Sequence, residues 1–287
     1  MAPMDSLPKI DGVRPARLDD LGRIALVAAA GFYYSPVFHY QRPYYDAFPE
    51  DTIASYQAEY ESVMLDPNSI VLVAEQVPDA NETDKAYKAL QRLCPSKPQT
   101  GSNGKVVVGV ASISLPPNSK RSGVIQLKGT STYHVQTEPR QQRDQCTKGG
   151  ELYSEATAPA KAKYLTGQMR LTTLAVHPAY WQHGHGTRLT NWCIRLADLD
   201  QVPVGVSAAK MGVKVFAKAG FQEEVKVHID GYELPDESRD SFGCGEEEPA
   251  NVTPIELWIG VRRPLPRQKP WLWRMLSCFI KAENEKL

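Results

Sequence analysis

The chain has 287 residues, of which 42% are hydrophobic and 23% are charged, and these values exclude collagen-like, coiled-coil and wholly disordered proteins. Its 33 lysines and arginines balance its 33 aspartates and glutamates, so no overall electric field draws the molecule to nucleic acid or to an anionic membrane. The length fits one enlarged α/β domain or two smaller domains.

The N-terminal stretch has neither the basic nor the apolar region of a signal peptide. The longest apolar run, residues 24–34, is too short to span a bilayer. The five cysteines show no CxxC spacing, which argues against a disulfide framework and against a zinc site. We therefore expect a cytoplasmic protein with free thiols and no metal.

In chain order, the pattern predicts a short strand from Gly12 and then a helix with Asp19 or Asp20 as its N-cap. A second helical period covers residues 53–64, and a compact apolar strand follows at 69–75. A loop at 78–104 contains a helical turn near 86–93, and 105–115 is a β-branched strand.

Residues 116–167 have few periodic apolar positions and predict a partly mobile insertion. The elements expected after it are a strand at 169–176, a helix at 187–198, a strand at 202–207, a helix at 211–219 that ends at Gly220, and final strands at 225–232 and 255–261 around an acidic loop at 235–250.

The segment Gly184-His-Gly186 lies between a predicted strand, which ends at Val176, and a predicted helix. Glycine lets the backbone approach an anion closely, and the free N–H groups at a helix N-terminus attract negative charge. This context predicts a phosphate cradle. It is not the dinucleotide fingerprint, because Leu189 stands where a third glycine would be.

These residues resemble the GNAT superfamily of acyl-CoA-dependent N-acyltransferases, whose motif is a strand, Val-x-Pro, a glycine loop and a helix. The resemblance continues in Ala208-Ala-Lys-Met-Gly212 and in Val215-Phe216-Ala-Lys-Ala-Gly220-Phe221, which look like the closing strand, helix and Gly-Phe of that family. It implies an α/β (α+β) GNAT fold, with a mixed central sheet of about seven strands flanked by helices.

The same resemblance implies one domain at 12–262, enlarged by insertions at 78–104 and 116–167 and by the acidic loop at 235–250. Residues 1–11 would be an N-terminal tail, and 263–287 a C-terminal amphipathic tail. The two central strands, after Thr173 and Val202, would splay apart around acetyl-CoA. The residues expected to bind this cosubstrate are Leu174, Ala175, Val176, Gln182, His183, Gly184, His185, Gly186, Thr187 and Arg188.

Two residues depart from the family pattern. Trp181 replaces a polar residue that usually contacts the phosphates, a contact that Gln182 or Arg188 could supply instead. Phe216 stands where many members carry a tyrosine that protonates the leaving thiolate, and phenylalanine cannot donate a proton. The strand at 168–176 also lacks the carboxylate that often serves as general base in relatives.

Residues 32–48 contain eight aromatic side chains, and this region forms a wall of the acceptor pocket in the family. Tyr40, Tyr44 and Tyr45 are candidate proton donors, and His39 and Asp46 are candidate bases. The alternative is that these aromatics pack the first two helices. A further candidate, His177, could instead be a packing residue at a strand end.

Several other features have simpler structural interpretations. His183 and His185 lack nearby metal-ligand types and are expected to be exposed loop imidazoles. Cys193 is expected to be a buried, inert thiol. The insertion at 118–167 could be a solvated loop or a lid. The amphipathic segment at 270–281 could pack on the domain or contact a membrane or partner.

The sequence thus predicts an enzyme, a GNAT-type acyltransferase that moves an acetyl or short acyl group from acetyl-CoA to a primary amine of a small molecule. Transfer would be direct, in a ternary complex. The alternatives are a non-catalytic CoA-binding or interaction protein on the same fold, and a CoA-dependent O-acyltransferase, hydrolase or decarboxylase. No nucleic-acid partner is expected, and the sequence carries no signal of an oligomer.

Overall fold

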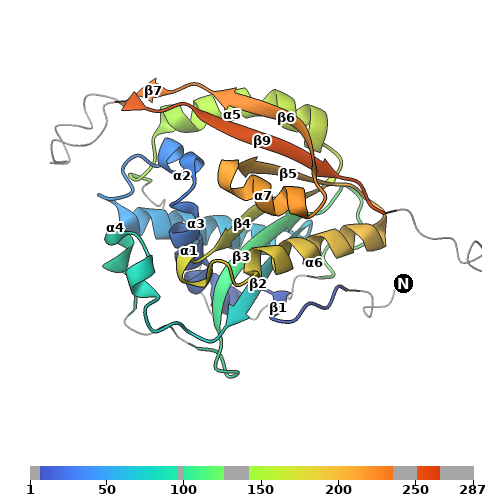
Figure 1. Cartoon of the computed structure of the whole chain (residues 1–287), viewed down its shortest axis with the longest axis horizontal. Coiled ribbons are helices and arrows are strands. Elements are labelled where there is room, and N and C mark those ends of the chain that lie inside the picture. The colour runs from blue at the N-terminus through green and yellow to red at the C-terminus, as the bar shows by residue number, and fades with distance from the viewer. Residues whose placement is uncertain (1–6, 96–97, 99, 126–141, 235–250, 266–287) are drawn as a thin grey trace, which may run out of the picture.

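The computed structural model describes residues 7–95, 98, 100–125, 142–234 and 251–265 (Figure 1). Its central sheet has seven strands in the order β1-β2-β3-β4-β5-β9-β6. Their bounds are β1 Val13–Pro15, β2 Ser69–Gln76, β3 Val106–Ser114, β4 Met169–Val176, β5 Val204–Ala209, β6 Gln222–Ile229 and β9 Ile255–Arg262. The β4–β5 pair is parallel and the other pairs are antiparallel. The predicted mixed sheet is thus confirmed.

Helices cover both faces of the sheet (Figure 1). The α helices are α1 Leu21–Phe32, α2 Pro36–Gln41, α3 Pro49–Leu65, α4 Lys88–Gln91, α5 Thr147–Leu165, α6 His185–Asp200 and α7 Lys210–Lys218. The minor elements are the 3-10 turns η2 Leu18–Asp20, η3 Thr83–Lys85 and η4 Pro178–Tyr180 and the hairpin strands β7 Tyr232–Glu233 and β8 Asn251–Val252.

Strand β2 is buried on both faces of the sheet, which shows why helices pack on each side of it. Successive strand residues point to opposite faces, so Ile70 and Leu72 join the core under α6 while Val71 and Val73 join the core under α1 and α3. A strand buried on both faces needs an unbroken apolar run. Residues 70–74 are such a run, and all of them are buried.

The sheet opens between its two central strands. Strands β4 and β5 pair only through Met169–Val204, Arg170–Gly205 and Leu171–Val206. Beyond these pairs, residues 172–176 of β4 have no partner on β5 within the described chain. Helix α1 closes tightly on the open part of β4, because a Cβ atom at Gly31 would lie 2.8 Å from the carbonyl oxygen of Val176. The predicted splay is therefore present.

The insertion at 118–167 was expected to be a solvated loop, and this is wrong for residues 147–165, which form helix α5. It packs on β6 and β9. The apolar periodicity of α5 is weak because glycines make its closest contacts. A Cβ atom at Gly149 would clash with the hydroxyl oxygen of Tyr232. At the other end of the helix, Leu165 packs directly against Gly205 of β5. Such contacts depend on the facing strands, so the local sequence does not display them.

Some boundaries differ from the sequence-based ones. Helix α6 begins at His185 rather than at residue 187, and the short helix α2 occupies part of the aromatic segment. Asp20 is the N-cap of α1, but its carboxylate binds Arg14 and the backbone N–H of Arg17. The acidic loop at 235–250 and the tail from 266 lie outside the described residues. Among the helices that are described, none is long and apolar enough to cross a membrane.

Candidate active site

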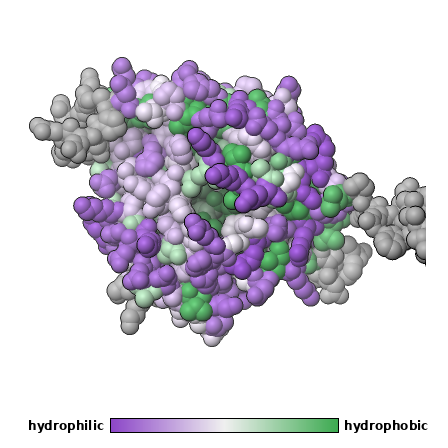
Figure 2. Space-filling model, in the orientation of Figure 1, coloured by the Kyte–Doolittle hydropathy of each residue, from purple (hydrophilic) through white to green (hydrophobic). Residues whose placement is uncertain are grey.

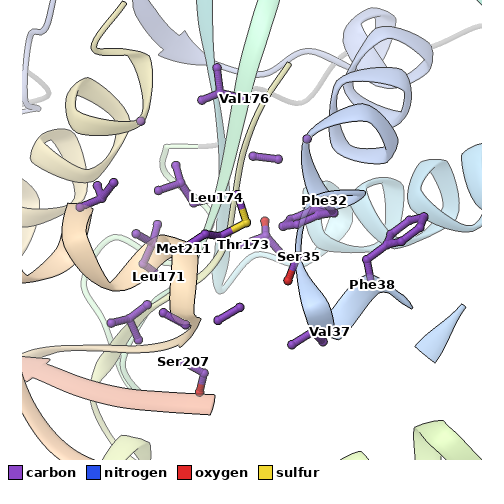
Figure 3. Close-up of a pocket in the computed structure, with 18 of the residues that line it drawn as sticks. Phe32, Ser35, Val37, Phe38, Leu171, Thr173, Leu174, Val176, Ser207 and Met211 are labelled. Carbon is purple, nitrogen blue, oxygen red and sulfur yellow. The ribbon is translucent and has the colours of Figure 1, made fainter. Parts of the chain in front are cut away.

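A cavity of about 590 Å³ occupies the opening between β4 and β5. Figure 2 shows a hollow on this face, with apolar residues inside and polar residues around it. In Figure 3, residues of α1 and α2 lie on one side of β4, and Met211 and Ser207 lie on the other side. The cavity therefore continues from the glycine loop, through the splay, to a chamber under α1, α2 and α3.

The glycine loop exposes backbone N–H groups to this cavity. Gln182 and Gly184 adopt left-handed backbone conformations, with φ of 64° and 81°. Helix α6 then begins at His185, and its first intrahelical bond runs from the N–H of Arg188 to the carbonyl of Gly184. The N–H groups of residues 185–187 consequently lack intrahelical acceptors, and all three residues line the cavity. Such a helix start favours an anion.

Strand β4 adds further free donors. The N–H of His177 donates to Val108 on β3. Because the two sides of a strand alternate along an antiparallel pair, the N–H groups of Leu174 and Val176 point away from β3, into the opening. Both residues line the cavity.

Trp181 supplies a hydrogen bond to a backbone carbonyl at the open end of β4. Its indole N–H donates to the carbonyl oxygen of Val176 at 2.7 Å, and its ring packs edge-on against Tyr34 with a centroid distance of 4.8 Å. The usual polar residue of the family is therefore replaced by a side chain that caps the end of β4.

Most of the predicted cosubstrate-binding residues line the cavity. Those that do are Leu174, Ala175, Val176, Gln182, Gly184, His185, Gly186 and Thr187. His183 and Arg188 are not among the lining residues. His183 is exposed and bonds to Gln76, and Arg188 donates to the carbonyl of His183.

His185 was expected to be an exposed loop imidazole, and this is wrong. It lies in the first turn of α6 and is only 1% exposed. Its Nε2 lies 2.6 Å from the amide oxygen of Gln76, and its Nδ1 lies 3.0 Å from a guanidinium nitrogen of Arg188. Burial, followed by the positive Arg188, lowers the pKa of His185 to about 4. The ring is thus neutral at pH 7, with Nε2 as donor and Nδ1 as acceptor.

The candidate acids and bases from the aromatic segment lie elsewhere. The Tyr40 hydroxyl donates to the carbonyl of Asp230 at 2.6 Å, and both Tyr40 and Tyr44 belong to a buried cluster with Tyr232. His39 packs against the rings of Tyr33, Phe38 and Tyr45, and burial lowers the pKa of His39. None of the three is among the described residues that line the cavity. Their positions agree with the alternative interpretation, in which the aromatic residues of this segment pack the protein core.

His177, the fourth candidate, is also absent from the described lining. It is fully buried, and its Nδ1 accepts a hydrogen bond from the N–H of Ala179 at 3.3 Å. Burial lowers the pKa of His177 to about 4. Its position is that of a turn cap inside the core.

Glu59 of α3 is a cavity residue that the sequence analysis did not single out. It is exposed to the cavity, yet the surrounding protein removes enough water to raise the pKa of its carboxyl group, an effect that the charge of Arg42 opposes. The next residue, Tyr60, donates to the Thr173 hydroxyl of β4 at 3.0 Å, which fastens this turn of α3 to the open strand. Glu59 is the one carboxylate among the described lining residues.

The chamber around Glu59 is largely aromatic and apolar. Phe32 stacks on Tyr56 with a centroid distance of 5.5 Å, and Phe38 of α2 and Tyr153 of α5 also line the cavity. On the opposite side, Phe216 of α7 lines it too and packs against Phe221. Phe216 therefore faces the cavity, and it has no hydroxyl group that could donate a proton there.

A mixed sheet that opens between parallel central strands, with a glycine loop and a helix after the first of them, defines the class of GNAT-type acyltransferases. No protein-family model matches the chain. It is 31% identical over 224 residues to an acetyltransferase of Stachybotrys chartarum (strain CBS 109288 / IBT 7711), a match that covers 77% of this chain and 85% of that protein. The chain belongs to the GNAT superfamily, and it is an acetyltransferase.

Solved structures of low sequence identity are also similar. A Corynebacterium glutamicum structure described as histone acetyltransferase HPA2 and related acetyltransferase is 17% identical, with a TM-score of 0.45 over 89% of this chain and 98% of that one. The mosquito arylalkylamine N-acetyltransferase like 5b is 17% identical, with a TM-score of 0.43 over 88% and 98%. A Thermoplasma acidophilum paiA N-acetyltransferase in complex with coenzyme A is 10% identical, with a TM-score of 0.42 over 88% and 97%.

Proposed function

We propose that this acetyltransferase moves an acetyl group from acetyl-CoA to the primary amine of a small molecule, by direct transfer in a ternary complex. The observation that carries the proposal is the cavity itself. One continuous space joins a loop of free backbone N–H groups to an aromatic chamber that holds a single carboxylate among its described residues, Glu59. These two ends suit an anionic acyl donor and a cationic acceptor.

The residues of the loop fit the phosphates of acetyl-CoA. The N–H groups at the start of α6 would bind the pyrophosphate, and Gly186 leaves room for it, because a Cβ there would have its nearest neighbours at 3.9 and 4.0 Å, the side chains of Val176 and Leu174. The free N–H groups of Leu174 and Val176 would bind the pantetheine arm along β4. Backbone donors held in place by a sheet lose little entropy when a ligand binds.

Acetyl-CoA supplies the thioester. Glu59 would attract the ammonium form of the acceptor and take a proton from it, directly or through water, so that the amine can attack the thioester carbon. The raised pKa of Glu59 brings its basicity closer to neutral pH, which favours general-base catalysis. As the carbon–sulfur bond breaks, the attacking nitrogen loses its second proton and becomes the amide. That proton passes through water to the leaving thiolate, because Phe216 has none to give.

The aromatic walls support an acceptor with an apolar body and a terminal amine. Phe32, Phe38 and Tyr56 line the cavity where such a body would lie, and aromatic contacts stabilise a bound ring beyond simple burial, by roughly 0.5–1.5 kcal/mol.

The test is an assay of the purified protein with acetyl-CoA and a panel of primary amines, in which thiol release and the mass of the product are both measured. We expect amine-dependent thiol release and a product that is heavier by one acetyl group. Thiol release without an amine would instead identify a hydrolase. CoA binding in calorimetry with no thiol release would contradict the proposal and favour a non-catalytic CoA-binding protein.

A further inference from the structure

Two charged side chains line the described part of the cavity, and they differ in how accessible they are to a ligand. Glu59 is exposed to the cavity. Arg42, at the end of α2, is 8% exposed. His185 also lines the cavity but is neutral at pH 7, since its pKa is lowered to about 4. A ligand in the aromatic chamber therefore meets one accessible charge, and that charge is negative.

Both terminal guanidinium nitrogens of Arg42 already have partners within the protein. One guanidinium nitrogen forms an ion pair with Asp144 and another donates to the Ser55 hydroxyl at 2.8 Å. The guanidinium carbon lies over the Tyr56 ring, 4.7 Å from its centroid. A carboxylate on a ligand would have to break these contacts before it could pair with Arg42.

Asp144 reaches Arg42 from a distant part of the chain. It is fully buried, and its carboxylate also accepts a hydrogen bond from the Thr52 hydroxyl at 2.8 Å. Its backbone carbonyl accepts from the N–H of Tyr44 at 3.2 Å, and the N–H of Cys146 donates to the carbonyl of Gln41. Residues 144–146 are thus fastened to α2 and to the turn after it.

We infer that the acceptor is an amine without a carboxylate, and that Asp144 is a positioning residue which sets this preference by neutralising Arg42. This inference rests on the proposed amine acetylation. A substrate carboxylate would lose its water, find no accessible cation among the described lining residues, and lie in the same chamber as Glu59. Unpaired buried charges and like charges close together are both unfavourable, so the chamber selects against amino acids.

The test compares three acceptors of similar shape: phenethylamine, phenylalanine and phenylalaninamide. The amide has almost the size of phenylalanine but no charge next to the amine. We expect kcat/KM for phenethylamine to exceed that for phenylalanine at least a hundredfold, and the amide to be acetylated at least tenfold faster than the acid. Equal rates for the acid and the amide would overturn the inference.

The variant Asp144→Asn tests the role of this residue. It leaves the Arg42 charge without its partner, so we expect the ratio of kcat/KM between phenethylamine and phenylalanine to fall at least tenfold, mainly through KM. The matched control is Asp51→Asn, since Asp51 pairs with the neighbouring Arg143 and neither of these two is among the described lining residues. A merely structural role for Asp144 would leave the ratio unchanged and overturn the assignment.

Each failure has its own meaning. If no amine of any kind is acetylated, the proposed function fails. If phenethylamine and other amines are acetylated but phenylalanine is acetylated equally well, only the present inference fails. The three-acceptor comparison uses the unaltered protein, so it decides the substrate class even if Asp144→Asn does not fold.

Discussion

The indole N–H of Trp181 donates a hydrogen bond to the carbonyl oxygen of Val176, 2.7 Å away. This bond joins the turn before the glycine loop to the last residue of β4, where the sheet has already opened. It holds the loop against the strand and satisfies a carbonyl that the splay leaves without a strand partner. A residue that departs from the family motif thus has a structural role in this chain.

The variant Trp181→Phe would remove that bond and keep an aromatic ring against Tyr34. We expect a loss of roughly 0.5–1.5 kcal/mol in the free energy of unfolding, measured by urea denaturation, together with weaker CoA binding. Tyr34→Phe is the control, because it keeps the indole bond. Unchanged CoA affinity in Trp181→Phe would show that the loop holds its shape without the bond.

Gly186→Val tests the phosphate cradle. The nearest protein atoms to a new Cβ are 3.9 Å away, so the fold should tolerate the side chain while the phosphates should not. We expect CoA affinity in calorimetry to fall at least tenfold, which is about 1.4 kcal/mol, with little change in the melting temperature. Gly22→Val is the matched control: it also lies in the first turn of a helix, α1, and a Cβ there has no neighbour within 4 Å. Equal CoA affinity in the two variants would refute the site.

Glu59→Gln tests the base. The pKa of Glu59 is raised because the surrounding protein excludes water from its carboxyl group. The ionised form is the active one, so the activity of the unaltered enzyme should rise with pH through that raised pKa. The variant should lose this limb of the kcat profile and at least a hundredfold in kcat, in the range of general-base effects. Glu61→Gln, on the same helix but outside the described lining, should keep both. A pH profile that is the same in Glu59→Gln would rule out the role.

The buried His177 predicts a pH-dependent stability. Its pKa falls from 6.5 to about 4 on folding, so the unfolded chain binds more protons between these values, and the stability that is present above pH 6.5 is lost as the pH falls toward 4. The variant His177→Asn keeps a side chain that can cap the turn and removes the titration. We expect the slope of unfolding free energy against pH to decrease by up to about 1.4 kcal/mol per pH unit in this window, as measured by urea denaturation at pH 6 and pH 5. An unchanged slope would contradict it.

Tyr40→Phe separates packing from catalysis. The hydroxyl donates to the carbonyl of Asp230 in a buried cluster, so its removal should lower the free energy of unfolding by about 1 kcal/mol. We expect kcat to stay within about twofold of its original value in the acetylation assay. A hundredfold loss of kcat at unchanged stability would return Tyr40 to the catalytic candidates.

The layers of the fold could be predicted because they follow from local patterns. The apolar run at 70–74 is buried on both faces of the sheet, and a short strand of this kind is legible in the sequence. The tight loop before α6 could be placed at Gly184 because a left-handed backbone, with φ of 81° here, favours glycine. Helix α5 was missed, because its small residues match distant strands rather than an apolar stripe of their own.

The residues of the aromatic chamber could not be predicted in the same way. Glu59 lies beside Tyr60 on an ordinary helix, and nothing in its neighbours along the chain distinguishes it from Glu61. The aromatic segment contributes residues such as Phe38 to the cavity lining. The candidate proton donors Tyr40 and Tyr44 instead point into a separate buried cluster. Side chains on a helix follow a fixed period of 3.6 residues, so which of them face the cavity depends on how the helix packs in the fold.

The sequence by itself determined the superfamily, the seven strands of the sheet, and the glycine loop, because these features depend on glycine, proline and strand periodicity within a short stretch. Only the tertiary structure decided which side chains line the cavity. Arg42 and Asp144 are 102 positions apart in the chain, and whether an arginine in the chamber attracts or ignores a ligand depends on whether such a partner is folded against it.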